Sequence, residues 1–245
     1  MLTRVHHVGL VVRRLEDGLA LWQDRLGLRV SKQATMADQG VKAALLPIGR
    51  SEIELLEPIS NEGGVGKFLA KRGEGLHHVC FETADVSAEL VAARESGFPL
   101  IDQAPRPGLA GMICFLHPKG TAGVLVEFAT PPAGERAHAP AAQGALAGLA
   151  LREVTARSTT VGAAATLFET KLGLERVDEA TVAAGGVRLH FVPGDAEGLS
   201  GLVLELPYLA AAAEALAPLA PRRDDVGLSV APEHCHGVPI TIRRG

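Results

Sequence analysis

Aromatic side chains are scarce in this 245-residue chain, which has seven Phe, one Trp and one Tyr. Such rings form the platforms on which bases stack in proteins that bind single-stranded nucleic acids. Basic residues are not in excess either, since 24 Lys and Arg stand against 28 Asp and Glu, giving a formal net charge of -4. We therefore expect no nucleic-acid partner and no attraction to anionic membranes.

Cysteines and long apolar runs are also few. Cys80, Cys114 and Cys235 never stand in C-x-x-C spacing, so neither a disulfide framework nor a thiolate zinc site is indicated. Residues 1–7 contain no signal-peptide core, and Glu and Pro interrupt the most apolar later stretch, residues 202–220. We predict a cytoplasmic protein without a membrane partner, whose 47% of hydrophobic residues can form a sizeable core.

A repeated pattern organises the first half of the chain. Two His-His pairs, His6-His7 and His77-His78, each begin a short apolar run typical of a strand. Helical spacing of apolar residues follows each run and predicts helices over about residues 15–26 and 86–95. Short apolar runs separated by Gly or Pro come next and predict strands over residues 41–47, 52–57, 111–116 and 123–129. The order in both units is βαβββ, and we expect the last three strands to form an antiparallel meander with the helix on one face.

The second half repeats this pattern in weaker form. Leu172-Gly173-Leu174 matches Leu26-Gly27-Leu28 at a distance of 146 residues, and the same distance relates Gly186-Val187 to Gly40-Val41. Near the end of the chain the separation between matching segments of the two halves falls to 114 residues. This decrease predicts that the second half has lost about one strand and its loops. We predict an α+β fold of four βαβββ modules, the last two degenerate. The expected domains are residues 1–130 and 148–245, joined by a Pro-, Ala- and Gly-rich linker over residues 131–147.

Each unit of the first half offers one histidine and one carboxylate. Glu54 follows His7 by 47 residues, and Glu127 follows His78 by 49 residues. If the two units pair about a pseudo-two-fold axis, two imidazoles and two carboxylates converge on one point. Such a set suits a divalent ion such as Co, Mn, Ni, Fe or Zn. The alternative is that the histidines are structural and the two glutamates face water from their strands.

Longer segments of the first half resemble the methylmalonyl-CoA epimerases of the vicinal oxygen chelate superfamily, which includes glyoxalases, bleomycin resistance proteins and dioxygenases. The resemblance covers about residues 4–130. Order, spacing and flanking residues agree together in the segments that carry it, which are 6–9, 52–58, 67–79, 115–119 and 123–127.

This resemblance implies paired βαβββ modules that form a U-shaped sheet around a divalent metal ion. It assigns His7, His78 and Glu127 as metal ligands. Glu54 stands at the fourth ligand position, where some epimerases have Gln and bacterial glyoxalase I has Glu. The site is then one charge more negative than in those epimerases.

The resemblance also implies the chemistry. In methylmalonyl-CoA the proton at C2 lies between a thioester and a carboxylate, and epimerisation removes it on one face and returns it on the other, which requires two acid/base groups. Glu127 resembles the ligand that doubles as one of them. For the other, one family branch has a Glu where this chain has Ala43, so that Glu57, Lys42 or His117 remain alternatives.

His117 and Lys119 lie in a His-Pro-Lys segment of the same resemblance. They are candidates for contacts with the substrate carboxylate or with CoA. The alternative is that this segment is an ordinary turn before a strand.

The second half departs from the ligand pattern. Glu153 stands in the place of His7, Gly201 near that of His78 and Thr241 near that of Glu127, while Glu54 aligns with Ser200 or Val203. We expect no second metal site there. His234-Cys235-His236 lacks a partner carboxylate in sequence, and we interpret it as a surface turn.

The resulting hypothesis is an isomerase, a metal-dependent epimerase of methylmalonyl-CoA or a related acyl-CoA. The alternatives are a glyoxalase I-like isomerase, that is a lactoylglutathione lyase, and a non-catalytic protein that binds small molecules. The resemblance implies a possible homodimer, although the second half could cover the surface that a partner chain would occupy.

Overall fold

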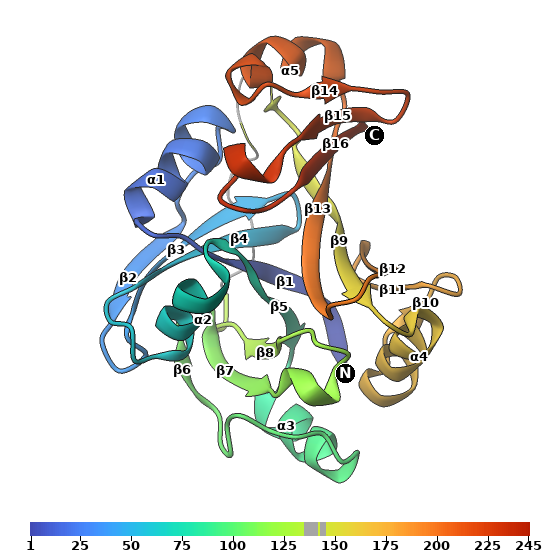
Figure 1. Ribbon diagram of the computed structural model, residues 1–245. Helices are drawn as coiled ribbons and strands as arrows, with labels where there is room; N and C mark the ends of the chain where they lie inside the picture. Colours follow the sequence, from blue (N-terminus) through green and yellow to red (C-terminus); the bar gives the residue numbers. More distant parts are fainter. Residues whose placement is uncertain (135–141, 143–145) are drawn as a thin grey trace. The chain divides into compact units, whose positions relative to one another are not determined.

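The computed structural model describes residues 1–134, 142 and 146–245 (Figure 1). Two βαβββ modules make up the first half of the chain. The first module consists of β1 (Leu2–Val11), α1 (Leu15–Leu19) continued by the π-helical turn η1 (Ala20–Arg25), β2 (Lys32–Met36), β3 (Val41–Ile48) and β4 (Ser51–Pro58). After α2 (Gly64–Arg72), the second consists of β5 (Gly75–Thr83), α3 (Val86–Glu95), β6 (Arg106–Gly108), β7 (Gly111–Leu116), the 3-10 turn η2 (Pro118–Gly120) and β8 (Val126–Thr130).

Two further βαβββ modules make up the second half. The third consists of β9 (Ala150–Ser158), α4 (Val161–Leu172), β10 (Glu175–Arg176), β11 (Thr181–Ala184) and β12 (Val187–Pro193). The fourth consists of β13 (Gly198–Leu206), α5 (Leu209–Leu216) with η4 (Ala217–Leu219), β14 (Arg222–Arg223), β15 (Gly227–Val230), η5 (Pro232–His234) and β16 (Ile240–Arg244).

The strands form two eight-stranded sheets of the same topology, β2-β3-β4-β1-β5-β8-β7-β6 and β10-β11-β12-β9-β13-β16-β15-β14. Within modules of the first half the last three strands are antiparallel neighbours, as in β2-β3-β4 and β6-β7-β8. The first strand of the second module, β5, pairs in parallel with its last strand, β8. The predicted α+β class, the four modules and the antiparallel meander are confirmed.

Local sequence explains the helices that were predicted. Asp85 caps the N-terminus of helix α3, because its side chain accepts hydrogen bonds from the backbone N–H groups of Ser87 and Ala88. Its buried residues Val86, Leu90 and Ala93 lie three and four positions apart and form one face. No helix in the described part of the chain is long and apolar enough to cross a membrane.

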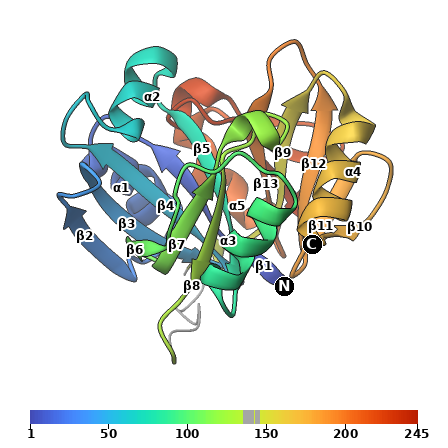
Figure 2. The same ribbon diagram turned by 90° about the horizontal axis from the view of Figure 1, so that it is seen from below.

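The chain divides into two compact units, each of which takes elements from both halves of the sequence. The first unit comprises the described residues of 1–7, 78–136 and 153–200. Within it α3 packs on β7 and β8, and α4 packs on β10, β11 and β12 (Figure 2). The ammonium group of Lys171 on α4 lies over the Phe98 ring, which follows α3, and donates a hydrogen bond to the carbonyl oxygen of Ser96.

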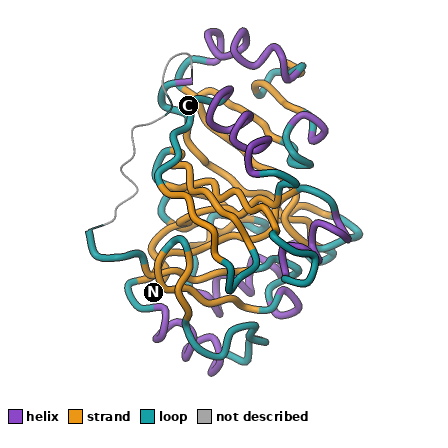
Figure 3. Tube along the Cα trace, turned by 90° about the vertical axis from the view of Figure 1, so that its left-hand side faces the viewer, coloured by secondary structure: helices purple, strands orange, loops and turns teal. Residues whose placement is uncertain are grey.

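The second unit comprises the described residues of 8–77, 137–152 and 201–245. Within it α1 packs on β3 and β4, α2 on β4, and α5 on β15 and β16. Figure 3 distinguishes the helices, in purple, from the strands, in orange. His236, which follows η5, contacts the first half, because Nδ1 lies 3.1 Å from Oε1 of Glu74 and Nε2 lies 3.2 Å from the carbonyl oxygen of Asp17. This residue of the predicted surface turn is therefore partly buried against the first half.

The expected loss of a strand from the second half is wrong, because β9–β16 include a counterpart of every strand of β1–β8. The missing element is α2, since β13 begins at Gly198, shortly after β12 ends at Pro193. The alignment of Gly186-Val187 with Gly40-Val41 is also wrong, because Val187 begins β12, which takes the place of β4 rather than β3. Gly-Val pairs occur at several hairpins of this fold, so they do not fix which hairpin is matched.

The same misalignment affects the expected replacement of Glu54. Ser200 and Val203 lie in β13, which takes the place of β5, so neither is the counterpart of a residue on β4. Strand β8 also begins later than predicted, at Val126, because Ala122 and Gly123 adopt positive φ angles in the preceding turn. Most of the predicted linker lies outside the described residues, and the domain boundaries remain a prediction.

Candidate metal centre

Three neighbouring strands of the first sheet present the candidate ligands of the first compact unit. His7 lies on β1, His78 on β5 and Glu127 on β8, and these strands are adjacent in the order β1-β5-β8. Cys80 is paired with Glu127, and side chains two positions apart point to the same face of a strand, so His78 and Glu127 share a face. All three ligand candidates are buried, with exposed fractions of 0%, 2% and 3% respectively.

The ring nitrogens of both histidines approach the same carboxylate oxygen. Nε2 of His7 lies 3.0 Å from Nε2 of His78 and 3.2 Å from Oε2 of Glu127. Nε2 of His78 lies 2.9 Å from that same oxygen. Glu54, on β4, is also buried, and the ligand atoms of these four residues all lie within 4.8 Å of one another. The structure thus brings together all four ligands predicted from the sequence.

The electrostatics of this cluster favour an ionised carboxylate. Burial by itself raises the pKa of Glu127, but the charges of His7 and His78 and the hydrogen bonds that they form lower it to about 2. Two buried imidazoles and two buried carboxylates are the mixed nitrogen and oxygen donors that divalent first-row transition metals accept. The residues present therefore fit such an ion, and His7, Glu54, His78 and Glu127 would hold it.

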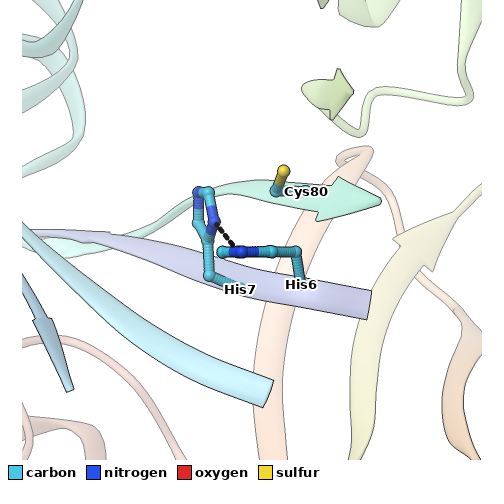
Figure 4. Close-up of side chains that lie close together, drawn as sticks. All are labelled: His6, His7 and Cys80. Atoms are coloured by element: carbon cyan, nitrogen blue, oxygen red, sulfur yellow. Dashed lines mark hydrogen bonds between the residues drawn. The ribbon is translucent and has the colours of Figure 1, made fainter. Parts of the chain in front are cut away.

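A residue that sequence reasoning left without a role supports His7. Nδ1 of His6 lies 2.9 Å from Nδ1 of His7, and His6 is 5% exposed (Figure 4). When Nε2 of His7 is a metal ligand, the proton of its neutral ring is on Nδ1, which then donates to Nδ1 of His6. The adjacency of the two histidines was the sequence feature from which this support could have been predicted. The first histidine of the other pair behaves differently, because the His77 ring packs edge to face against Phe68 at 5.0 Å.

Cys80 lies close to the same pair of histidines (Figure 4). Its sulfur and the nearest ring nitrogens of His6 and His7 all lie within 4.8 Å of one another, and all three residues are buried. This group shares His7 with the four-residue cluster. Because the short contact between His6 and His7 is a hydrogen bond, we assign the three residues to the support of the cluster.

The predicted substrate-binding residues lie in the turn before β8. Nδ1 of His117 accepts a hydrogen bond of 3.1 Å from the backbone N–H of Lys119, and this contact caps η2. His117 is partly buried, whereas Lys119 is exposed. Their contact with substrate remains a prediction.

Among the alternatives for the second acid/base, Glu57 has both carboxylate oxygens engaged. Oε1 accepts from Nζ of Lys42 at 2.7 Å, and Oε2 accepts from the backbone N–H of Leu15 at 2.7 Å. Burial raises the pKa of Glu57, but these hydrogen bonds and the charge of Lys42 outweigh it and lower the pKa. Ala43 is fully buried and carries no acid/base group.

The second half contributes no residue to either candidate metal-binding group found among the described residues. In the His234-Cys235-His236 segment, His234 is exposed and Cys235 is buried. Burial raises the pKa of the Cys235 thiol to about 12, so it is not a thiolate at neutral pH.

This fold and cluster agree with the comparison with known families. The model of the Glyoxalase/Bleomycin resistance protein/Dioxygenase superfamily matches residues 6–116, and the chain belongs to this superfamily. Within it, the first half is similar to methylmalonyl-CoA epimerases.

Two curated relatives and one solved structure illustrate this similarity. The chain is 33% identical over 131 residues to an ethylmalonyl-CoA/methylmalonyl-CoA epimerase of Cereibacter sphaeroides, a match that covers 52% of this chain and 98% of the relative. It is 37% identical over 131 residues to the uncharacterised protein YqjC of Bacillus subtilis, covering 53% of this chain and 94% of that protein. A Streptomyces coelicolor methylmalonyl-CoA epimerase in complex with 2-nitronate-propionyl-CoA is 38% identical, with a TM-score of 0.53, and the match covers 54% of this chain and 100% of that chain.

Proposed function

We propose that this protein is an isomerase that epimerises methylmalonyl-CoA or a closely related acyl-CoA, and that it requires a divalent metal ion. The observation that carries the proposal is the convergence of His7, His78 and Glu127 on one point. These residues lie in the half of the chain that is similar to epimerases along nearly their whole length. The chemistry that a bound divalent ion supplies is Lewis acidity toward the thioester oxygen, where negative charge develops.

Glu127 is the proposed first acid/base group. Its lowered pKa keeps the carboxylate ionised at neutral pH, as the acceptance of a proton from C2 requires. Oε2 lies 3.2 Å from Nε2 of His7 and 2.9 Å from Nε2 of His78, so the carboxylate stands beside the nitrogens that would hold the ion. Burial of the cluster excludes water from the carbon that carries the charge.

Glu54 is the proposed second acid/base group. It is the other carboxylate of the four-residue cluster, and it is 5% exposed. Glu57 is less suitable because both of its oxygens already accept hydrogen bonds. Two carboxylates in one cluster supply the two acid/base groups that inversion at C2 requires.

The test follows solvent deuterium into the substrate. Protein loaded with Co²⁺ is incubated with methylmalonyl-CoA in D2O, and deuterium at C2 is measured by mass spectrometry. We expect rapid exchange in the wild type and strongly reduced exchange in Glu127→Gln, which keeps the shape of the side chain but removes the base. Exchange that is absent from the metal-loaded wild type, or unchanged in Glu127→Gln, would overturn the proposal.

Glu54 also supports the second candidate, a glyoxalase I-like isomerase, because that enzyme has Glu at this ligand position. The same preparation is therefore offered the hemithioacetal of methylglyoxal and glutathione. Turnover of this compound without exchange at C2 of methylmalonyl-CoA would favour the glyoxalase-like function. Binding of either compound without turnover would favour a non-catalytic binding protein.

A further inference from the structure

One aromatic ring connects a candidate metal ligand to an arginine. Phe115 on β7 is paired with Glu127 on β8, and its ring meets that of His78 edge to face, with centroids 5.4 Å apart. The guanidinium of Arg106, on β6, lies over the same Phe115 ring, with Cζ 5.5 Å from the ring centroid. All four residues belong to the first compact unit.

The sheet register places this arginine on the face that carries the cluster. Arg106 is paired with Ile113, and Phe115 is two positions further along β7. Side chains two positions apart on a strand point to the same face, and paired residues on neighbouring strands share it. Arg106, Phe115 and Glu127 therefore all lie on one face of the first sheet.

Asp102 fixes the orientation of the guanidinium. Its Oδ1 accepts from Nε of Arg106 at 3.1 Å, and its Oδ2 accepts from the backbone N–H of Phe115 at 2.9 Å. The carboxylate is thus tied to β7 and holds the arginine over the Phe115 ring. A cation held in this way loses little further side-chain entropy when it binds a ligand.

The guanidinium is incompletely paired. Its Nη1 is buried and has no hydrogen-bond partner among the described residues, while the contact with Asp102 is made by Nε. The side chain as a whole is 35% exposed, so Arg106 lies at the border between the buried face and solvent. A buried donor that lacks a partner is costly, and pairing with an incoming carboxylate would relieve that cost.

We propose that Arg106 binds the free carboxylate of a malonyl-type acyl-CoA and thereby selects such thioesters over neutral ones. This inference rests on the proposed function. The free carboxylate of a malonyl-type thioester carries a negative charge that neutral thioesters lack, and a cation on the face that carries the cluster can pair with it. Removal of the C2 proton adds another negative charge beside this carboxylate, which strengthens the attraction to such a cation.

The test compares two ligands that differ only in this carboxylate. Calorimetry measures the affinity of metal-loaded protein for malonyl-CoA and for propionyl-CoA. Because one charge-assisted contact is at stake, we expect the wild type to prefer malonyl-CoA by about 10- to 100-fold, and Arg106→Gln to lose this preference while its affinity for propionyl-CoA is unchanged. The matched control is Arg94→Gln, an exposed arginine of α3 that donates to the carbonyl oxygen of Gln103, and it should keep the preference.

Retention of the preference in Arg106→Gln would overturn the inference, and so would an equal loss of affinity for both ligands. Arg106→Lys keeps a cation at this position and should retain part of the preference, which guards against misfolding of the Gln variant. Exchange of deuterium at C2 is measured on the same preparations. Selective binding without exchange in the wild type would reject the proposed function alone, whereas exchange with an unaltered preference in Arg106→Gln would reject the role of Arg106 alone.

Discussion

The two halves of the chain share a fold but differ in what their sheets carry. Strands β1–β8 and β9–β16 have the same order in their sheets, yet all candidate ligands found among the described residues belong to the first half. In the second sheet the pair Val203 and Thr241 takes the place of Cys80 and Glu127, and Val203 is an apolar residue that is 7% exposed. Burial of apolar surface therefore suffices to hold this fold, and the buried charged cluster is an addition that costs desolvation free energy.

Contacts between the halves follow a reciprocal pattern within the two units. In the second unit a Cβ on Gly49, in the β3–β4 turn, would lie 2.7 Å from Cβ of Ala150 at the start of β9. In the first unit a Cβ on Gly185, in the corresponding β11–β12 turn, would lie 2.3 Å from Cβ of Arg4 on β1. Such reciprocity is typical of two-fold related copies. The second half therefore shares the packing of the fold with the first, whereas the candidate ligands found among the described residues lie in the first half alone.

The largest effect is expected from removing a ligand in the first half. His78→Ala should abolish Co²⁺ binding and deuterium exchange, because Nε2 of His78 lies within 3.0 Å of Nε2 of His7. The matched control in the second half is His190→Ala, whose ring contacts the hydroxyl of Thr181 at 2.8 Å. Metal analysis after dialysis measures the Co²⁺ content of both variants. If His78→Ala kept its metal, or if His190→Ala lost it, the chemistry would not be confined to the first half.

A smaller effect is expected from the residue behind the ligand. His6→Phe removes the acceptor for Nδ1 of His7 and should weaken Co²⁺ binding by about 10- to 100-fold. His6→Asn supplies an amide oxygen and should restore most of the affinity. His77→Phe serves as the control, since His77 packs against Phe68. Competition with a chelator measures the affinities, and equal weakening by His6→Phe and His77→Phe would count against the assigned role.

Stability should reveal the contact between the halves in the second unit. Gly73 and Gly237 have nearly the same φ, +76° and +77°, but a Cβ on Gly237 would lie 2.3 Å from the carbonyl oxygen of Glu74, whereas one on Gly73 meets nothing within 4 Å. Gly73 has φ 76° and ψ -163°, a backbone conformation found almost only in glycine, so Gly73→Ala should cost about 1–3 kcal/mol for the backbone alone. Gly237→Ala should cost at least about 1 kcal/mol more, or about 2–4 °C in Tm. Equal Tm values for the two variants would show that this contact does not form.

The smallest effect concerns two of the three buried thiols, Cys114 in the first half and Cys235 in the second. Burial raises the pKa of Cys114 and of Cys235 to about 12, so the reactive thiolate forms only as the pH approaches that value. Both residues should resist iodoacetamide in the native protein at pH 8 and react after unfolding, as mass spectrometry of tryptic peptides would show. Rapid native alkylation of Cys235 alone would indicate that the second half opens more readily than the first.

The sequence predicted the elements whose patterns are strong. Helices over residues 15–26 and 86–95 follow from apolar spacing and terminal glycines, and the structure contains both. The sequence did not locate β2, in which no residue is fully buried and partly buried positions alternate with exposed ones, nor the three-residue β6. The position of α2 was also missed, because Gly63, Gly64 and Gly66 obscure its helical pattern.

The candidate site likewise contains residues that the sequence predicted and residues that it did not. His7, Glu54, His78 and Glu127 could be predicted because their spacing repeats, and the family resemblance assigned them as ligands. The proposed role of Arg106 could not be predicted, because it depends on contacts with Asp102 and Phe115 that form only once the strands of the sheet have paired. The support of His7 by His6 requires side-chain orientations that no spacing encodes.

The most direct test of the account is the metal stoichiometry of the whole chain. Calorimetric titration of metal-free protein with Co²⁺ should give one equivalent per chain, bound by the cluster of the first half. The absorption spectrum of bound Co²⁺ should disappear in His78→Ala. Two equivalents per chain, or none, would contradict the claim that the two halves share a fold while only the first carries a metal centre.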